Sequence, residues 1–348
     1  MKKKFSMVIG NPPYQDDTTG DNKTYAPPVY NKIMEAAQKV ADKTILITPA
    51  RFLFDAGGTP KDFNRRMLND PHFKVLDYAP DASKYFKGVD IEGGVAITQY
   101  DNTRTFEPIG TFIPYNELRS ICEKVIGRPD FRPLSEIIYS RKIFKLTEKF
   151  YEENPAAPTY LKDDNNYTIG TNAFEVMNEY FFDAEPDDGH DYIKIFGKLG
   201  VERVYRWIRR DYVNEPAPLE KFKVFLPKAN GASGKLGDEA ARLISKPVIG
   251  EPSVGATETF IAVGAFDSRA EAEACLTYLK SKFARVLLGV LKITQDNTAD
   301  KWAKVPLQDF SATSDIDWGG RVDEQLYRKY GLKAAEIDFI ERHVKAMD

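Results

Sequence analysis

The residues best suited to chemistry lie near the start of the chain, in the stretch Asn11-Pro12-Pro13-Tyr14. The two prolines hold the backbone in an extended turn, with an amide side chain at one end and an aromatic ring at the other. The side-chain oxygen of Asn11 and the carbonyl oxygen of Pro12 can together accept both N–H groups of an aromatic amine such as that of adenine. The nitrogen lone pair, otherwise delocalised into the ring, then becomes available to attack a methyl group.

Tyr14 supplies the second part of this chemistry. Its ring can stack on a base that has been turned out of a double helix, and stacking of roughly 1–3 kcal/mol per base helps to offset the cost of extrusion. No general base of unusual pKa is needed, which suits a chain with only three histidines. The structural alternative is a turn that ends a strand and has no chemical role.

The spacing of the other reactive residues indicates no second kind of centre. Cys122 and Cys275 lie far apart and lack metal-ligand spacing, so we expect neither a disulfide framework nor a metal site. No apolar segment has the length needed to span a bilayer, so we expect a cytoplasmic protein without a membrane partner. The formal net charge of −3 gives no global signal for nucleic acid, which must be sought in local patches.

The elements that position the turn alternate between strand-like and helix-like patterns. Met7 to Ile9 form an apolar strand that runs into the turn, and a helical pattern follows over about 29–42. A compact apolar run at 45–47 and a helix start at Thr59-Pro60 come next, followed by two more strand-like segments. This alternation predicts a doubly wound α/β unit over residues 1–125. Residues 126–348, which are rich in Pro, Gly and Asn, suggest an irregular α+β domain.

A basic stretch with interleaved aromatic residues begins in the second half of the chain. Tyr205, Trp207 and Tyr212 alternate there with cations, a mixture that suits phosphate contact and base stacking. A solvated helix face with aromatic residues in the core is an equal alternative. The candidate DNA-contact residues are Arg203, Arg206, Arg209, Arg210, Lys228 and Lys235, together with Lys292 at the end of one long helix expected from Ser268.

Several longer segments resemble a known enzyme family. They are "ITPARFLFDAGGTPKDFNRRMLND", "VDIEGGVAITQYD", "KSKFARVLLGVLKITQDNTADKWAKVPLQDF" and "DIDWGGRVDEQLYRKYGL", which follow NPPY in the family's order. The chain resembles the C-terminal part of a gamma-class N6-adenine DNA methyltransferase of the type IIG restriction-modification enzymes. The resemblance implies the second half of a Rossmann-like methyltransferase sheet in residues 1–125 and a TaqI-like target-recognition domain in residues 126–348.

The resemblance also implies roles for individual residues and partners. Asn11, Pro12, Pro13 and Tyr14 match the family's catalytic motif, and Tyr100 falls near its second base-stacking aromatic residue, although a core tyrosine is about equally compatible. The cofactor implied is S-adenosylmethionine, and the partner implied is double-stranded DNA.

One feature departs from the family. Its S-adenosylmethionine site, with an acidic-glycine loop, lies upstream of NPPY, and the doublets Gly57-Gly58 and Gly93-Gly94 do not replace that loop. We therefore expect the chain to be inactive without a cofactor-binding subunit. We also expect the apolar strand before the turn to be an open edge, covered by that subunit, by a second copy in a homodimer, or by a rearranged N-terminus.

Several alternatives stay open at this point. The chain could be a separately encoded subunit, a gene remnant or a truncation. It could also be a non-catalytic DNA-binding module or specificity subunit that keeps the turn without methylating. A methyltransferase acting on RNA or on a protein amide is a weaker alternative, because the C-terminal segments resemble DNA-specificity regions.

Overall fold

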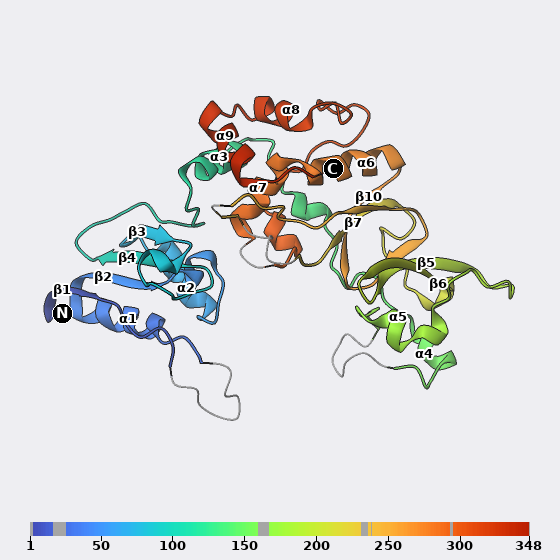
Figure 1. Cartoon of the computed structure of the whole chain (residues 1–348), viewed down its shortest axis with the longest axis horizontal. Coiled ribbons are helices and arrows are strands. Elements are labelled where there is room, and N and C mark those ends of the chain that lie inside the picture. The colour runs from blue at the N-terminus through green and yellow to red at the C-terminus, as the bar shows by residue number, and fades with distance from the viewer. Residues whose placement is uncertain are drawn as a thin grey trace. The chain divides into compact units, whose positions relative to one another are not determined.

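The computed structural model describes residues 3–16, 26–158, 167–230, 236–237, 239–292 and 295–347. The chain divides into two compact units, Met1–Asn116 and Glu117–Asp348, and Figure 1 shows the elements of each. Within the described ranges, every helix is too short or too polar to cross a lipid bilayer. The same ranges hold no group of His, Cys, Asp or Glu side chains placed to bind a metal ion.

The N-terminal unit is built on a four-stranded mixed sheet. Its strands are β1 (Phe5–Gly10), β2 (Ala41–Pro49), β3 (Phe73–Ala79) and β4 (Val95–Asp101). The order is β1-β2-β4-β3, with β1 parallel to β2 and with β4 antiparallel to both of its neighbours. The helices of the unit are α1 (Tyr30–Val40), α2 (Lys61–Asn69), and the 3-10 segments η1 (Arg51–Phe54) and η2 (Ala82–Lys84). The α/β class expected from the sequence is confirmed.

The direction of β4 follows from its connection to β3. The residues between these strands contain only the short η2 rather than a crossover helix, and such a connection joins antiparallel strands. As a result β1, β2 and β3 all end at one edge of the sheet, where β4 begins, with Val95 paired to both Pro49 and Ala79. We call this the carboxyl edge. The NPPY turn, η1 and η2 all follow strands that end there.

Strand β1 is an outer strand of this sheet. Within the described residues it pairs only with β2, and 55% of Phe5, 43% of Met7 and 69% of Ile9 is accessible. The other strands pack against a core in which Phe52 contacts the rings of Phe63 and Phe73. The open apolar edge expected from the sequence is therefore present among the described residues.

The boundary between the units falls earlier than the expected 125/126 division. Helix α3 (Asn116–Ile126) bonds to α9 (Ala334–His343) in the C-terminal unit. Glu336 of α9 accepts hydrogen bonds from Ser120 and Lys124 of α3, each at 2.6 Å. These contacts, over more than 200 residues of sequence, place α3 in the second unit.

The C-terminal unit contains two three-stranded sheets, ordered β10-β7-β8 and β6-β5-β9. Its strands are β5 (Tyr192–Leu199), β6 (Glu202–Arg209), β7 (Phe222–Pro227), β8 (Val248–Gly250), β9 (Val254–Ala256) and β10 (Phe260–Phe266). Its other helices are α4 (Glu148–Glu153), α5 (Ala173–Val176), α6 (Arg269–Lys280), α7 (Lys282–Leu291) and α8 (Val322–Lys329), with short 3-10 segments η3 (Leu134–Ile137), η4 (Asn178–Tyr180), η5 (Arg210–Tyr212) and η7 (Ala299–Trp302).

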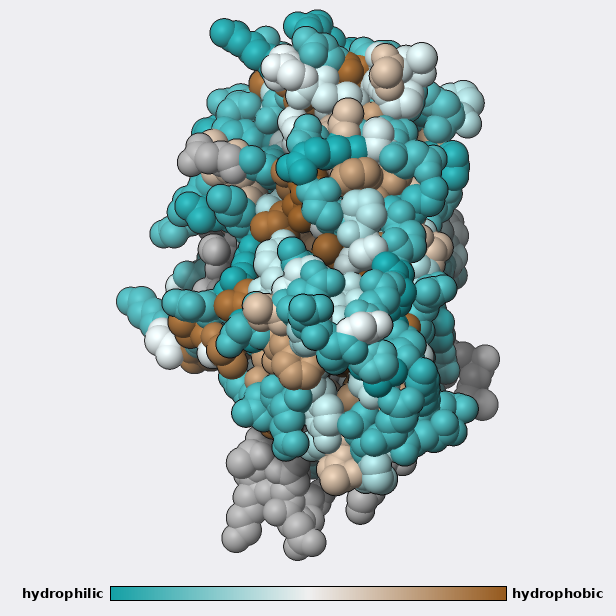
Figure 2. Space-filling model, turned by 90° about the vertical axis from the view of Figure 1, so that its right-hand side faces the viewer, coloured by the Kyte–Doolittle hydropathy of each residue, from teal (hydrophilic) through white to brown (hydrophobic). Residues whose placement is uncertain are grey.

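The long helix expected from Ser268 is two helices. Ser268 does cap α6, through a capping box with Glu271. The helix stops at Ser281, whose side chain accepts a hydrogen bond from the Ala284 N–H and so begins α7. The Asp323 carboxylate accepts the N–H groups of Lys282 and Phe283, the first two residues of α7, so the new helix start is satisfied without an upstream turn. The face of the protein in Figure 2 is mostly hydrophilic and carries only small apolar patches.

Candidate functional site

The two acceptors required by the amine chemistry are both available at the end of β1. Asn11 is exposed and Pro12 is half-buried. No hydrogen bond joins the Asn11 side chain or the Pro12 carbonyl to another residue of the described ranges. The turn is fixed nonetheless, because the Tyr14 carbonyl accepts the Val29 N–H at 3.1 Å and Asp16 N–H donates to Pro27 at 2.9 Å. The acceptors are therefore held in place while remaining free to bind a ligand.

Tyr14 faces an aromatic partner at the same carboxyl edge. Its ring centroid lies 6.5 Å from that of Phe86, with the rings inclined at 74°. Phe86 follows η2, and its N–H donates to the Ala82 carbonyl at 2.9 Å. The Tyr14 hydroxyl is buried and has no hydrogen-bond partner among the described residues, and burial raises its pKa. A planar base inserted here would stack on one ring and contact the edge of the other.

The structure does not bring Tyr100 to this site. Tyr100 lies on β4 opposite Thr44 of β2, which in turn pairs with Val8. Tyr100 is therefore level with Val8, near the end of β4 that is distant from the carboxyl edge. Asn11 lies three residues beyond Val8, roughly 10 Å nearer to that edge along the strand direction. The Tyr100 ring contacts His72 instead, at 6.0 Å between centroids. The assignment of Tyr100 as a base-stacking residue is therefore corrected, because β4 runs antiparallel and carries it away from the carboxyl edge.

Two pairs of charged residues lie in the segments that follow β2 and β3. Arg51 of η1 forms an ion pair with Glu92 at 3.2 Å. Asp77 accepts hydrogen bonds from Lys84 and from the Tyr85 hydroxyl, and these bonds lower the pKa of its carboxyl group. The acceptors of the turn and the two aromatic rings accordingly provide hydrogen bonding and stacking at this edge.

Comparison with known proteins bears on this edge. Residues 1–86 match the family model of the Eco57I restriction-modification methylase. No curated protein matches the chain. Among solved structures the chain is similar to the type IIG restriction endonuclease BpuSI, with 10% sequence identity, a TM-score of 0.35, and coverage of 97% of this chain and 48% of that one. The chain thus spans about half the length of BpuSI.

The matched segment runs from the chain start to Phe86 and so contains both aromatic residues of the edge. Sequence reasoning missed Phe86 because it sought the second aromatic residue on a strand. Phe86 could have been identified from its position in the loop after β3, a strand that ends at the same carboxyl edge as β1. Tyr100 lies beyond the matched segment.

In the basic stretch, Arg209 and Arg210 are engaged by carboxylates. Arg209 bonds to Asp211 at 2.6 Å and to Glu153 at 3.0 Å. Arg210 donates at 2.6 Å to each of Asp191 and Glu220. These bonds raise the pKa of both guanidinium groups. The two arginines fix the local backbone, and their charge is largely neutralised within the unit.

The other arginines of the stretch point to different faces. Strand alternation places Arg203 on the same face of β6 as Tyr205 and Trp207, and places Arg206 on the opposite face, where it pairs with Asp183. Arg203 donates to the Lys246 carbonyl at 2.6 Å, and burial lowers its pKa. The sequence pattern predicted a basic stretch with interleaved aromatic residues, and the pleat of β6 places its arginines on two faces.

The remaining lysines differ in their surroundings. Lys228 is half-buried and lies 3.6 Å from Glu258. Lys292 is only 1% exposed, and its ammonium donates to the Leu243 carbonyl at 2.8 Å and to Asn230. Its assignment as a DNA contact is therefore corrected, since a buried side chain at a helix end cannot reach a phosphate. Lys235 lies outside the described residues.

Proposed function

We propose that the N-terminal unit holds the target adenine of a site-specific DNA adenine-N6 methyltransferase of a restriction-modification system. The observation that carries the proposal is the pair of free acceptors at Asn11 and Pro12 beside the rings of Tyr14 and Phe86. This arrangement lies wholly within the segment that matches the methylase family. The order of the four strands supports an origin as the second half of a Rossmann-like sheet.

In the proposed mechanism the chain acts on the amine rather than on the donor. The Asn11 side-chain oxygen and the Pro12 carbonyl accept the two amine hydrogens and draw the nitrogen towards tetrahedral geometry. These hydrogen bonds strengthen as positive charge develops on nitrogen, so they stabilise the transition state more than the ground state. Tyr14 and Phe86 hold the extruded base in position. Sequence-specific contact with double-stranded DNA is assigned to the C-terminal unit.

Gly57, Gly93 and Gly94 do not fit the glycine loop of an S-adenosylmethionine site. A Cβ atom added at Gly57 or Gly93 would meet the Arg51 side chain, and one added at Gly94 would lie 2.1 Å from the Ala79 carbonyl oxygen. The space beside these glycines is therefore filled by the protein's own atoms and forms no cradle for a cofactor. We propose that a cofactor-binding half, on this or another polypeptide, pairs with the exposed edge of β1.

The filled glycine positions also favour a second candidate function. A DNA-binding module or specificity subunit that retains the turn would bind DNA without methylating it. The two functions differ in their need for Asn11. Base capture depends mainly on the aromatic rings, whereas methyl transfer depends on the Asn11 amide.

Base capture can be tested on the chain itself. DNA carrying 2-aminopurine opposite an abasic position lowers the cost of extrusion, and stacking on Tyr14 or Phe86 should quench the fluorescence of the extruded base. We expect Tyr14→Ala and Phe86→Ala each to weaken capture by about tenfold and Tyr100→Phe to leave it unchanged. Equal fluorescence titrations for wild type, Tyr14→Ala and Phe86→Ala would contradict the proposed site.

A further inference from the structure

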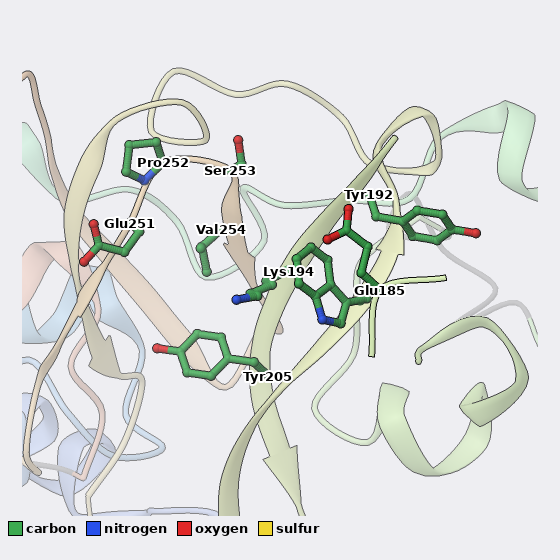
Figure 3. A pocket seen from close by; sticks show the side chains of 9 residues that line it. Glu185, Tyr192, Lys194, Tyr205, Glu251, Pro252, Ser253 and Val254 are labelled. Atoms are coloured by element: carbon green, nitrogen blue, oxygen red, sulfur yellow. The ribbon is translucent and has the colours of Figure 1, made fainter. Parts of the chain in front are cut away.

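A pocket lies over part of one face of the β5–β6 ribbon in the C-terminal unit. It has a volume of about 420 Å³, within the range of small-molecule sites. Figure 3 shows its side chains, which come from β5, β6, the segment before β5, and the loop that leads into β9. The lining residues used below are Lys194, Tyr205, Trp207, Glu185 and Glu251.

The floor of the pocket is aromatic. Trp207 pairs across the ribbon with Lys194, and Tyr205 pairs with Phe196, so both rings stand on the same face. Tyr205 is 42% exposed although it lies over Phe196, with 4.9 Å between ring centroids. Tyr192 also borders the pocket, but its hydroxyl points away from Lys194 in Figure 3. Exposed aromatic surface that is backed by a buried ring is a rigid stacking platform.

The ammonium group of Lys194 lies at this aromatic floor and has no acidic partner among the described residues. The Lys194 ammonium lies 4.6 Å from the centre of the Trp207 ring. Within the described ranges it forms no ion pair or hydrogen bond through its side chain, and the same is true of Lys198, two residues further along the same face. The two ammonium groups can therefore contact phosphates. Because the Lys194 ammonium already lies against the indole ring, a positively charged ligand would be repelled there.

The walls supply hydrogen-bond acceptors. Glu185 follows a segment in which Phe182 exchanges two backbone hydrogen bonds with Trp207, at 2.8 and 2.9 Å. Glu251, which pairs with Arg269, lines the opposite side in Figure 3. Carboxylates accept hydrogen bonds from the exocyclic amines of bases. The pocket thus combines aromatic rings, carboxylate acceptors and the ammonium group of Lys194.

The pocket is held open by a residue of the basic stretch. Arg210 donates to the Ser253 hydroxyl at 2.8 Å, while Ser253 donates to Glu220 at 2.9 Å. Ser253 has a φ of 58°, a backbone conformation that is uncommon for residues other than glycine. Its carbonyl accepts a hydrogen bond from the Lys194 N–H at 3.2 Å. The wall is therefore braced before any ligand arrives.

We propose that this pocket binds an unpaired nucleobase together with its phosphate. The base takes the place of the Lys194 ammonium on the Trp207 ring and also stacks on Tyr205, its amine donates to Glu185, and its phosphate contacts the displaced Lys194 ammonium and Lys198. The source we assign is an unpaired strand of DNA, which rests on the proposed function; a free nucleotide offers the same chemistry and is distinguished by the test. The pocket belongs to a different unit from the NPPY turn, so the two sites can be tested separately.

The test uses the full chain and a fluorescein-labelled single-stranded DNA of about 12 nucleotides, with dAMP as the free-nucleotide probe. We expect Trp207→Ala to weaken oligonucleotide binding about tenfold, and Trp207→Phe to restore most of it. Lys194→Met should weaken binding several-fold and lower the salt slope by about one. Arg328→Ala, which removes an exposed cation of α8, is the matched charge control and should change neither quantity.

The outcomes separate the two sites and the two sources. If the oligonucleotide binds much more tightly than dAMP, and its binding depends on Trp207, the pocket is a site for DNA. If dAMP binding depends on Trp207 to the same extent, the pocket is a site for free nucleotides. Tyr14→Ala should leave pocket binding intact, and Trp207→Phe should leave 2-aminopurine capture intact, so failure at one site is distinguishable from failure at the other. If Trp207→Ala, Trp207→Phe and Lys194→Met, each with wild-type circular dichroism, bind both probes as wild type does, the proposal is overturned.

Discussion

At the scale of residues, the same side-chain type has opposite roles in different surroundings. Lys194 faces an open pocket, whereas Lys223 and Lys292 are buried and donate to backbone carbonyls. Lys223 bonds to the carbonyls of Leu219, Lys221 and Glu251 at 2.9, 3.0 and 2.7 Å. Buried ammonium groups of this kind crosslink loops, and their contribution to stability depends on their protonation.

The buried lysines predict a pH dependence of stability. Burial lowers the pKa of Lys223 and of Lys292 to about 7, against about 10.4 in an unfolded chain. Between these values the unfolded state binds more protons, so the free energy of unfolding should rise as pH increases from about 7 to about 10. We expect Lys292→Met to reduce this rise in urea titrations. A slope unchanged from wild type would show that Lys292 is protonated equally in both states.

The residues of the site also show what the sequence could and could not predict. Asn11 to Tyr14 were identifiable because two prolines and an apolar strand make the turn visible locally. Phe86 was not, since its proximity to Tyr14 depends on β1 and β3 ending at one edge of a sheet. Lys292 was misassigned because charge alone does not reveal burial.

At the scale of elements, hydrophobic periodicity located the four strands of the first sheet and missed the reversal of β4. The reversal depends on a connection without a helix, a tertiary feature. The expected helix from Ser268 broke at Ser281 because a remote carboxylate, Asp323, caps the second helix. Local patterns thus identified elements, whereas their ends and directions depended on contacts distant in sequence.

Strand β1 provides a prediction at this scale. An outer strand with exposed Met7 and Ile9 can pair with another chain, and without a partner the purified chain should self-associate through it. Ile9→Lys should weaken self-association by about tenfold or more, because a charge on an edge strand opposes pairing. Sedimentation velocity over a range of concentrations measures this, with Val201→Lys, at another exposed apolar residue, as the control. Equal association of Ile9→Lys and wild type would exclude β1 as the contact.

At the scale of the whole molecule, the two units divide the work that the proposal requires. The N-terminal unit carries the acceptors and rings for one base, and the C-terminal unit carries a braced ribbon with unpaired cations and an aromatic pocket. A net charge of −3 fits this division, because attraction to DNA would come from a few local cations rather than from the overall charge. The match to the methylase family, over residues 1–86, lies within the first of these units.

The central claim is that Asn11 activates the amine of adenine. The most direct measurement joins the chain to the cofactor-binding half of an Eco57I-type methylase and quantifies N6-methyladenine in DNA by mass spectrometry. We expect N6-methyladenine with wild-type Asn11 and a loss of about 100-fold or more in Asn11→Ala, since the amide acts in the transition state. DNA affinity should stay within about threefold of wild type, since phosphate contacts dominate affinity. Undiminished N6-methyladenine in Asn11→Ala would contradict the central claim.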